Sequence, residues 1–213
     1  MGKTNLEVGA ISAPRFEFRT FGKQFDQAAF RMARLSSPVP EKVWERHSKE
    51  IYIVSATNNK NNTKIRDGKM DIKTFIQEKD GLEQWNPLMK GEFPIAKSVL
   101  EKEVFPAFAT EMPKLTKDTY SLDEFLTMVR ANDSLKAVSV EKQRFGYMVN
   151  DTICEVANVW INGAKLVSIN SESTVLEDIR KTMKDVGIDS CENINYLQAV
   201  KRVIGMIDKP FAN

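Results

Sequence analysis

The feature that most constrains the fold is a predicted β-hairpin at 63–73. Two short alternating runs, Thr63–Arg66 and Lys69–Lys73, are separated by Asp67-Gly68. A two-residue Asp-Gly between alternating runs is a strong hairpin signal, because a type I′ turn needs a positive φ at both central residues. Side chains alternate between the two faces of a strand. One face of this hairpin is therefore apolar, and the other is dense in lysine and arginine.

The charged face of this hairpin has two candidate environments. Antiparallel sheets commonly expose one face to water, so a charged strand face is most often simply solvated. The other interpretation places the charged face inside a closed barrel. Cations enclosed in that way would need carboxylates, water or a bound polyanion. The hairpin alone favours the solvated face, and the rest of the chain is needed to choose between the two.

Other predicted strands repeat the alternation of charged and apolar residues. The first, Arg15–Phe21, places Arg15, Glu17 and Arg19 on one face and phenylalanines on the other. Further strands are predicted at Glu50–Ser55, Leu82–Pro94, Ala137–Met148, Thr152–Ile161 and Lys165–Glu172, with turns at Thr57–Asn62, Asn150-Asp151 and Asn162-Gly163. The polar side chains that these strands align include Lys90 with Glu92, Lys142 with Arg144, Glu155, and Ser168 with Asn170 and Glu172.

Helical patterns are interleaved with the strands, at 23–35, 95–131 and 174–206. Pro38 and Pro40 are expected to end the first helix, and capping boxes are expected at Ser121 and Thr174. Amphipathic helices need an apolar surface to cover, so we expect them to pack outside a sheet or barrel. That requirement favours an apolar outer face. The barrel interpretation and the solvated-face interpretation are then equally supported by the residues.

Composition excludes several classes of function. The chain of 213 residues has 42% hydrophobic and 28% charged residues, typical of a soluble globular protein. Its net charge of +2 gives no support to a nucleic-acid role. Cys154 and Cys191 are too few for a disulfide framework, and His47 is the only histidine, so no zinc spacing exists. The polar start 1–5 and the lack of a long apolar run predict a cytoplasmic protein without membrane segments.

The chain resembles the CYTH superfamily, also called the triphosphate tunnel metalloenzymes. The residues that carry the resemblance are Arg15–Phe21, Lys64–Lys73, the Lys142-Gln-Arg144 strand, Glu155, Ser168–Glu172 and Asn195-Tyr196. The motifs are short, but together they span nearly the whole chain. The resemblance implies an α+β fold in which an antiparallel eight-stranded β-barrel, the triphosphate tunnel, is flanked by helices. It also implies one domain covering residues 1–213.

The resemblance further implies a site inside the barrel, in which basic residues grip a triphosphate and carboxylates hold Mg²⁺ or Mn²⁺. The expected substrate-binding residues are Arg15, Arg19, Lys64, Arg66, Lys73, Lys142 and Arg144. The expected catalytic and metal-binding residues are Glu17, Glu155 and Glu172, with Asp71 or Glu92 in support. Hard divalent cations take oxygen ligands, and guanidinium and ammonium groups neutralise phosphate, so these residue types suit that chemistry.

One departure from the family pattern concerns the metal. The first strand of the family typically reads Glu-x-Glu-x-Lys, whereas the matching positions here are Arg15, Glu17 and Arg19. Arg19 keeps a cation and Glu17 keeps one carboxylate. Arg15 places a positive charge where a metal ligand is expected, which makes the metal doubtful.

Three interpretations remain open from the sequence. The first is metal-dependent hydrolysis of tripolyphosphate or of a nucleoside or organic triphosphate, which leaves open whether the chain is an enzyme. The second is a tunnel that binds polyphosphate or a nucleotide without turnover. The third is an α+β interaction protein whose charged strands are solvated. No nucleic-acid or membrane partner is expected, no adenine pocket is indicated, and the sequence does not give the oligomeric state.

Overall fold

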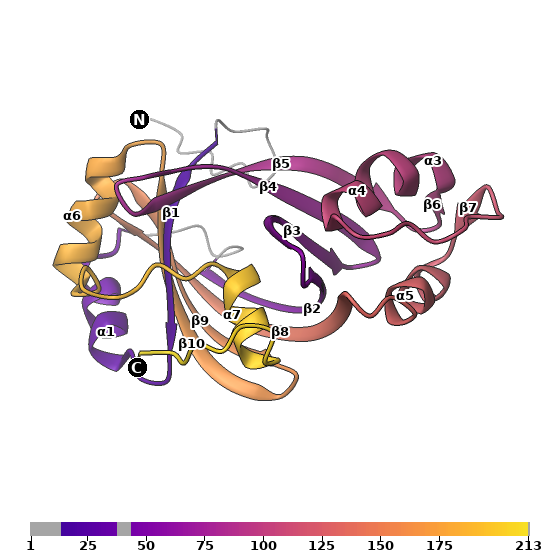
Figure 1. Ribbon diagram of the computed structural model, residues 1–213. Helices are drawn as coiled ribbons and strands as arrows, with labels where there is room; N and C mark the ends of the chain where they lie inside the picture. Colours follow the sequence, from indigo (N-terminus) through magenta and orange to yellow (C-terminus); the bar gives the residue numbers. More distant parts are fainter. Residues whose placement is uncertain (1–13, 38–43, 213) are drawn as a thin grey trace.

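The computed structural model describes residues 14–37 and 44–212 (Figure 1). The expectations that fall on the polar start at 1–5 and on Pro38 and Pro40 lie outside these residues. No helix within the two described ranges is long and apolar enough to cross a bilayer.

Eight antiparallel strands form a closed barrel, as predicted. Their order around the barrel is β1-β10-β9-β8-β2-β3-β4-β5, and β1 pairs with β5 to close it. The strands are β1 (Phe16–Gly22), β2 (Glu45–Ser55), β3 (Asn58–Arg66), β4 (Lys69–Lys79), β5 (Leu82–Glu92), β8 (Leu135–Val149), β9 (Thr152–Ile161) and β10 (Ala164–Ser173). Neighbours in sequence pair directly except where the helical segments intervene.

Two predicted hairpin turns have the expected geometry. The backbone φ angles are 52° at Asp67 and 70° at Gly68, and 47° at Asn162 and 86° at Gly163. Positive φ at both central residues suits the right-handed twist of the flanking strands. These turns fix the register of β3 against β4 and of β9 against β10, and so determine which side chains face inward.

One apolar outer surface of the barrel is covered by two helices, α1 (Asp26–Leu35) and α6 (Leu176–Val186). They bury Phe16 and Phe18 of β1 together with outer residues of β8, β9 and β10. In Figure 1 these helices lie together at the left of the barrel. Because Phe16 and Phe18 point outward, Glu17 and Arg19, which alternate with them, point inward.

The opposite side of the barrel carries a helical lobe. It runs through β6 (Ile95–Ala96), α3 (Lys97–Val99), the π-helical η1 (Leu100–Val104), α4 (Phe105–Phe108), β7 (Thr119–Tyr120) and α5 (Leu122–Arg130). The lobe buries outward side chains of β2 to β5, among them Ile65, Met70 and Ile72. Figure 1 shows this lobe at the right, at the far end of the long β4–β5 ribbon. The apolar face of the predicted hairpin is thus covered, and its charged face points inward.

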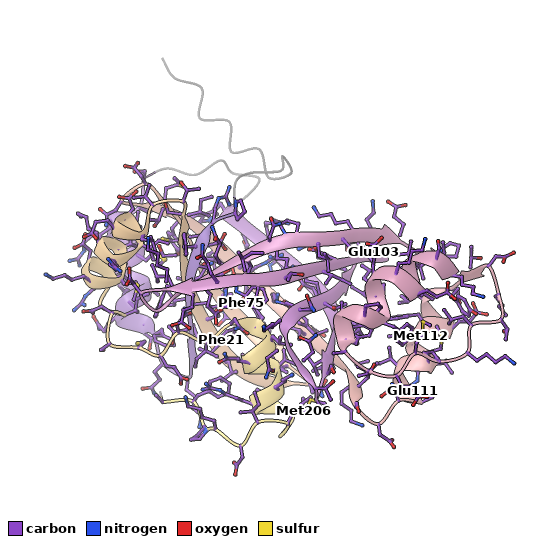
Figure 2. All side chains as sticks on the ribbon, turned by 45° about the horizontal axis from the view of Figure 1, so that its top comes forward. Phe21, Phe75, Glu103, Glu111, Met112 and Met206 are labelled. Atoms are coloured by element: carbon purple, nitrogen blue, oxygen red, sulfur yellow. The ribbon has the colours of Figure 1, made fainter. Side chains whose placement is uncertain are left out.

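The last helix closes one end of the barrel instead of covering its outside. This helix, α7 (Tyr196–Val203), packs with Tyr52 and Val54 of β2 and with other inward residues of the strands. Figure 2 shows Phe21 and Met206, two members of the same cluster, beside α7. Lys201 anchors the helix by donating hydrogen bonds of 2.7 Å to Asn58 O and Asn59 Oδ1. This helix was expected to pack outside the barrel, but it plugs one end instead. The barrel is therefore a cup with α7 as its floor.

The expected strand boundaries were wrong in two places. Strand β2 begins at Glu45 and not at Glu50, and Asn58–Asn62 belongs to β3, so the turn into it is only Ala56-Thr57. Both stretches are polar on both faces and show no apolar period, but they pair with neighbouring strands, 45–49 with β8 and 58–62 with β2 and β4.

The two expected capping boxes have different outcomes. At Ser121 the box is present, because the Ser121 hydroxyl accepts from Glu124 N while Glu124 accepts from Ser121 N. At Thr174 it is absent, because α6 is capped at Val175 without a side-chain hydrogen bond. The chain is still finishing β10 at Ser173, so the helix starts later than the sequence suggests.

This difference gives a test of the helix boundaries. Ser121→Ala should lower the free energy of unfolding by about 1 kcal/mol, the usual cost of losing an N-cap. Thr174→Ala, a matched change at an exposed position with no capping role, should leave it nearly unchanged. Urea unfolding of both variants measures the two values. Equal losses would show that Thr174 caps α6 after all.

Candidate functional site

The inner face of the barrel carries charges of both signs, drawn from most of its strands. Ion pairs and hydrogen bonds link these side chains across strands that are distant in sequence. The inward charged residues that make such contacts are Glu17, Arg19, Glu50, Lys64, Arg66, Asp71, Lys142, Arg144, Glu155 and Glu172. The structure therefore brings together most of the residues predicted from the sequence.

Arg19 of β1 lies where three predicted carboxylates converge. Its Nε is 2.5 Å from Glu17 Oε1, its Nη1 is 3.5 Å from Glu155 Oε1, and its Nη2 is 4.0 Å from Glu172 Oε1. Nη1 also donates to Ser168 Oγ at 3.0 Å. Burial opposes the positive charge, but the three carboxylates raise the pKa of Arg19 above its ordinary value. The guanidinium thus links β1, β9 and β10.

Carboxylates also face one another across neighbouring strands. Glu17 of β1 is paired in register with Glu172 of β10 on one side and with Glu83 of β5 on the other. Burial and, next, the charge of Glu17 raise the pKa of Glu172 to about 7. Burial likewise raises the pKa of Glu83, which accepts hydrogen bonds from Asn195 and Trp85. Like charges at opposed positions destabilise a sheet unless something neutralises them.

A second centre is the buried pair of Glu50 and Lys142. Lys142 Nζ donates to Glu50 Oε2 and to the hydroxyl of Tyr52, each at 2.8 Å. Burial lowers the pKa of Lys142 to about 7 in spite of Glu50. Burial alone would raise the pKa of Glu50, but Lys142 and Lys64 hold it well below its ordinary value. Glu50 is therefore ionised at neutral pH, and Lys142 is its nearest cation.

Tyr196, at the start of α7, lies under both centres. Lys142 Nζ is 3.7 Å from the centroid of the Tyr196 ring, and Arg19 Cζ is 4.7 Å from it. The same ring meets Phe21 edge-on at 5.0 Å and Tyr52 at 5.7 Å. A cation over an aromatic face is stabilised, more so when it is desolvated. The floor of the cup is therefore an aromatic platform for two of its cations.

Arginines gather nearer the open end. Arg46 of β2 is paired in register with Arg144 of β8, and Arg66 of β3 lies close enough to act on Arg46 electrostatically. Burial and these two neighbours lower the pKa of Arg46. Arg66 Nη1 is 3.5 Å from Glu50 and Arg144 Nε is 4.0 Å from Glu155. Within the described ranges, no carboxylate lies within ion-pair distance of Arg46.

Two cavities flank the Asp67-Gly68 turn. One, of about 440 Å³, is lined by the inward Lys64 and Asp71, which lie 3.8 Å apart, and by Arg66 and Lys90. The other, of about 480 Å³, reaches Lys142 and Ser48. Of the two supporting residues predicted, Asp71 pairs with Lys64, whereas Glu92 lines the first cavity and pairs with the exposed Lys69.

Two predicted cations lie at the edge of the group. Arg15 precedes β1 and reaches Glu172, with 3.8 Å between Nη1 and Oε2. Lys73 of β4 is exposed, and its charge acts on Glu172 and on Lys64. Burial lowers the pKa of Lys64 itself.

The carboxylates have the right oxygens for Mg²⁺ or Mn²⁺ but do not form a metal site as they are arranged. The oxygens of Glu17, Glu155 and Glu172 contact the guanidinium of Arg19, and Glu172 also contacts Arg15. In the part of the chain that the structure describes, no group of three carboxylate, histidine or cysteine side chains is placed to hold a metal ion. Arg19 therefore opposes metal binding at these carboxylates, as Arg15 was expected to do from the sequence.

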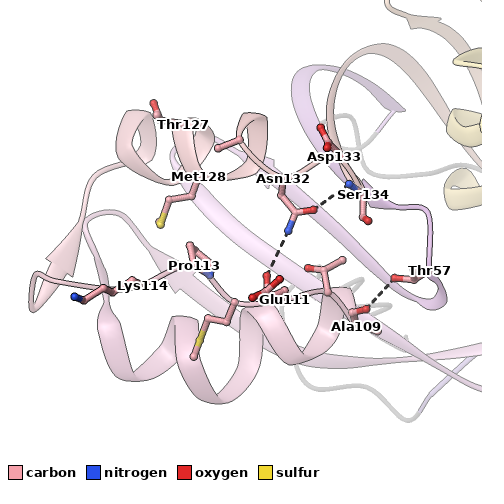
Figure 3. Close-up of a pocket in the computed structure, with 13 residues that line it drawn as sticks. Thr57, Ala109, Glu111, Pro113, Lys114, Thr127, Met128, Asn132, Asp133 and Ser134 are labelled. Atoms are coloured by element: carbon pink, nitrogen blue, oxygen red, sulfur yellow. Dashed lines mark hydrogen bonds between the residues drawn. The ribbon is translucent and has the colours of Figure 1, made fainter.

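A further cavity lies outside the barrel, between α4 and α5 (Figure 3). It measures about 740 Å³ and includes Met112, Pro113 and Met128 in its lining. Its charged lining residues are one lysine, Lys114, and two carboxylates, Glu111 and Asp133. This cavity lacks the clustered cations of the cup and is not an anion site.

Sequence reasoning missed Arg46, Glu50, Glu83 and the role of Tyr196. Arg46 lies in a stretch that has no apolar alternation, so no strand was predicted there. Glu50 was placed on a strand, but its inward direction follows from pairing with Arg66 and Val140, which the sequence does not give. An asparagine such as Asn195 can mark the start of a helix, and here its Oδ1 accepts from Gln198 N. Nothing in the sequence shows that this helix packs inside the barrel, which is what places Tyr196 in the site.

Comparisons with known proteins support the fold. No protein-family model and no curated protein sequence matches the chain. Among solved structures, a candidate adenylate cyclase from Bacillus halodurans matches with a TM-score of 0.51 and 13% identity, over 86% of this chain and 95% of that one. A candidate adenylyl cyclase from Hippeastrum, described as having a dominant triphosphatase activity, matches with a TM-score of 0.49 and 11% identity, over 93% and 99%.

The Mimivirus capping enzyme triphosphatase is more distant, with a TM-score of 0.41 and 9% identity, over 83% of this chain and 90% of that one. Of these three structures, the Bacillus halodurans protein has the TM-score above 0.5. It supports the fold, and the closed eight-stranded barrel flanked by helices confirms the architecture that the sequence resemblance implied.

Proposed function

We propose that the cup binds tripolyphosphate, or the triphosphate group of a nucleoside or other organic compound. The observation that carries the proposal is the cluster of Arg46, Arg66 and Arg144 above the buried Lys142. Their carboxylate partners are shared, because Glu50 serves both Arg66 and Lys142, and Glu155 serves both Arg144 and Arg19. A polyanion would bring negative charge to these three arginines, and guanidinium forks suit phosphate oxygens.

The fold shared with the Bacillus halodurans protein is compatible with this proposal but does not choose a substrate. The solvated-face interpretation loses its basis, since the charged strand faces point into the barrel.

The first test compares two cations on neighbouring strands. Arg66→Ala should weaken tripolyphosphate binding about tenfold or more, since a hydrogen bond to a charged group contributes roughly 1.5–3 kcal/mol. Lys142 still neutralises Glu50 in this variant, so the fold should persist. Lys49→Ala removes a cation from the outer face of β2, where Lys49 pairs with Glu141, and should leave binding unchanged.

Calorimetric titration at constant ionic strength measures both variants, with monophosphate as a second ligand. Screening alone would act on both anions alike, whereas a site that spans several strands favours the longer one. Matching effects of Arg66→Ala and Lys49→Ala would place the anion elsewhere and contradict the proposal.

The second test uses the carboxyl group of Glu172, whose pKa is raised to about 7. Above pH 7 it is ionised and repels an incoming polyphosphate, and below pH 7 it is neutral. Glu172→Gln should therefore bind tripolyphosphate about tenfold more tightly than the wild type at pH 8.5, and about equally at pH 5.5. The ratio of the two affinities cancels the titration of the ligand itself.

The raised pKa of Glu172 also makes the stability of the unliganded protein depend on pH. A carboxyl group with a raised pKa favours folding below its ordinary pKa, and this contribution is lost as the pH rises through 7. The tripolyphosphate titrations at pH 8.5 and pH 5.5 are made with a metal chelator present. Weaker binding by Glu172→Gln at both pH values would mean that Glu172 serves mainly to orient Arg15 and Arg19.

Metal-dependent hydrolysis of the bound triphosphate is the second candidate function. The observation that favours it is the row of opposed carboxylates Glu83, Glu17 and Glu172, with Glu155 close by. A row of this kind is relieved by a cation, and in the present arrangement Arg19 and Arg15 meet that need. We therefore expect the wild type to bind Mg²⁺ or Mn²⁺ weakly and to hydrolyse tripolyphosphate slowly.

The third test changes Arg15. Arg15→Glu replaces a cation that pairs with Glu172 by a further carboxylate, and should increase Mn²⁺-dependent phosphate release about tenfold. Arg15→Gln, which removes the charge without adding a ligand, should give a smaller increase. A Mn²⁺ titration of phosphate release compares the three proteins. Fast wild-type hydrolysis that Arg15→Glu abolishes would show that Arg15 grips the substrate.

A further inference from the structure

We propose that the hydroxyl of Tyr196, on the plug helix α7, binds the innermost phosphate group of the ligand in the cup. The proposal rests on the proposed triphosphate binding and adds a residue that belongs to no strand. It makes α7 part of the binding site as well as the closure of the barrel. Its basis is a buried donor that has no hydrogen-bond partner among the described residues, on a ring that two cations contact.

The position of Tyr196 is fixed by packing. The residue is only 8% exposed, and its ring is held against Phe21 and Tyr52. Asn195, the preceding residue, ties the start of α7 to β5 by donating to both carboxylate oxygens of Glu83 at 3.0 Å. The ring therefore has little freedom to turn its hydroxyl toward another partner.

The hydroxyl of Tyr196 is buried and has no hydrogen-bond partner among the described residues. Buried hydroxyls are almost always hydrogen-bonded, to protein, water or ligand. Burial raises the pKa of Tyr196, so the group stays protonated at neutral pH and can donate. The Tyr52 hydroxyl nearby differs in this respect, because it already accepts from Lys142 at 2.8 Å.

The surroundings of the hydroxyl carry charges of both signs, two arginines and two carboxylates. The charges that act on it come from Arg19, Glu155, Glu50 and Arg144, all of which face the interior of the cup. Among the described residues, Arg144 Nε is a second inward donor without a hydrogen-bond partner, whereas the inward Asp71 Oδ1 and Asn170 Oδ1 are acceptors without one. The two donors, on α7 and β8, have no acceptor in the described part of the protein and suit a phosphate oxygen. A phosphate group beside Arg19 and Lys142 would accept from the Tyr196 hydroxyl.

The test is Tyr196→Phe in the full chain, with tripolyphosphate as the probe and a metal chelator present. The change keeps the ring and its contacts with Arg19 and Lys142 and removes only the hydroxyl. We expect an unchanged or higher melting temperature without ligand, because an unsatisfied buried group is lost. We also expect tripolyphosphate affinity to fall about tenfold, the loss typical of a hydrogen bond to a charged acceptor.

Two matched variants serve as controls. Tyr52→Phe removes a hydroxyl that has a partner, and should lower the melting temperature of the free protein. Tyr147→Phe makes the same chemical change on the outer face of β8, in the cluster under α1 and α6, and should leave tripolyphosphate affinity unchanged.

The outcomes separate this inference from the proposed function. If the wild type does not bind tripolyphosphate, triphosphate binding is wrong, and the role of Tyr196 fails with it. If the wild type binds and Tyr196→Phe binds equally well, only the role of Tyr196 is overturned. A lower melting temperature for Tyr196→Phe with unchanged affinity would assign the hydroxyl to a structural water, which also overturns it.

Discussion

The structure depends on a division of the strand faces that barrel closure imposes. A closed barrel has no edges, so each residue of an alternating strand faces either the interior or the outer surface. Here α1 and α6 cover the apolar outer face on one side, and the lobe from α3 to α5 covers it on the other. The charged faces of these alternating strands therefore point into the interior of the barrel. Had the helices been absent, the same alternation would have suited an ordinary sheet with one wet face.

Charges enclosed in this way must neutralise one another, and the pairs that do so are interdependent. Glu50 is shared between Lys142 and Arg66, while Glu155 is shared between Arg19 and Arg144. Removing one partner of a buried pair typically costs 3–5 kcal/mol, because the other charge is left uncompensated. The plug helix supports the same network by placing the ring of Tyr196 under Arg19 and Lys142. Tyr196 thus packs in the cluster that closes the barrel and also stabilises two cations of the network.

How much the sequence predicts depends on how local each cause is. The turns at Asp67-Gly68 and Asn162-Gly163 were predictable because positive φ is a property of two adjacent residues. The strand around Arg46 was not, since it is polar on both faces and is specified by pairing with β8. The helical pattern up to residue 206 predicted the last helix, but an amphipathic helix can pack inside or outside a barrel with the same pattern. Thr174 had the residues of a capping box but lay too close to the end of β10.

The near balance of charge inside the cup bears on which anions it can select. A ligand that enters must take guanidinium contacts away from carboxylates such as Glu172 and Glu155. A single phosphate replaces one such contact with another of similar strength, so its net gain is small. Under the proposed function, a chain of phosphates would meet cations of β1, β2, β3 and β8 at once and gain several contacts for one loss of translational freedom. The internal ion pairs would then discriminate against short anions while keeping the cations in place for long ones.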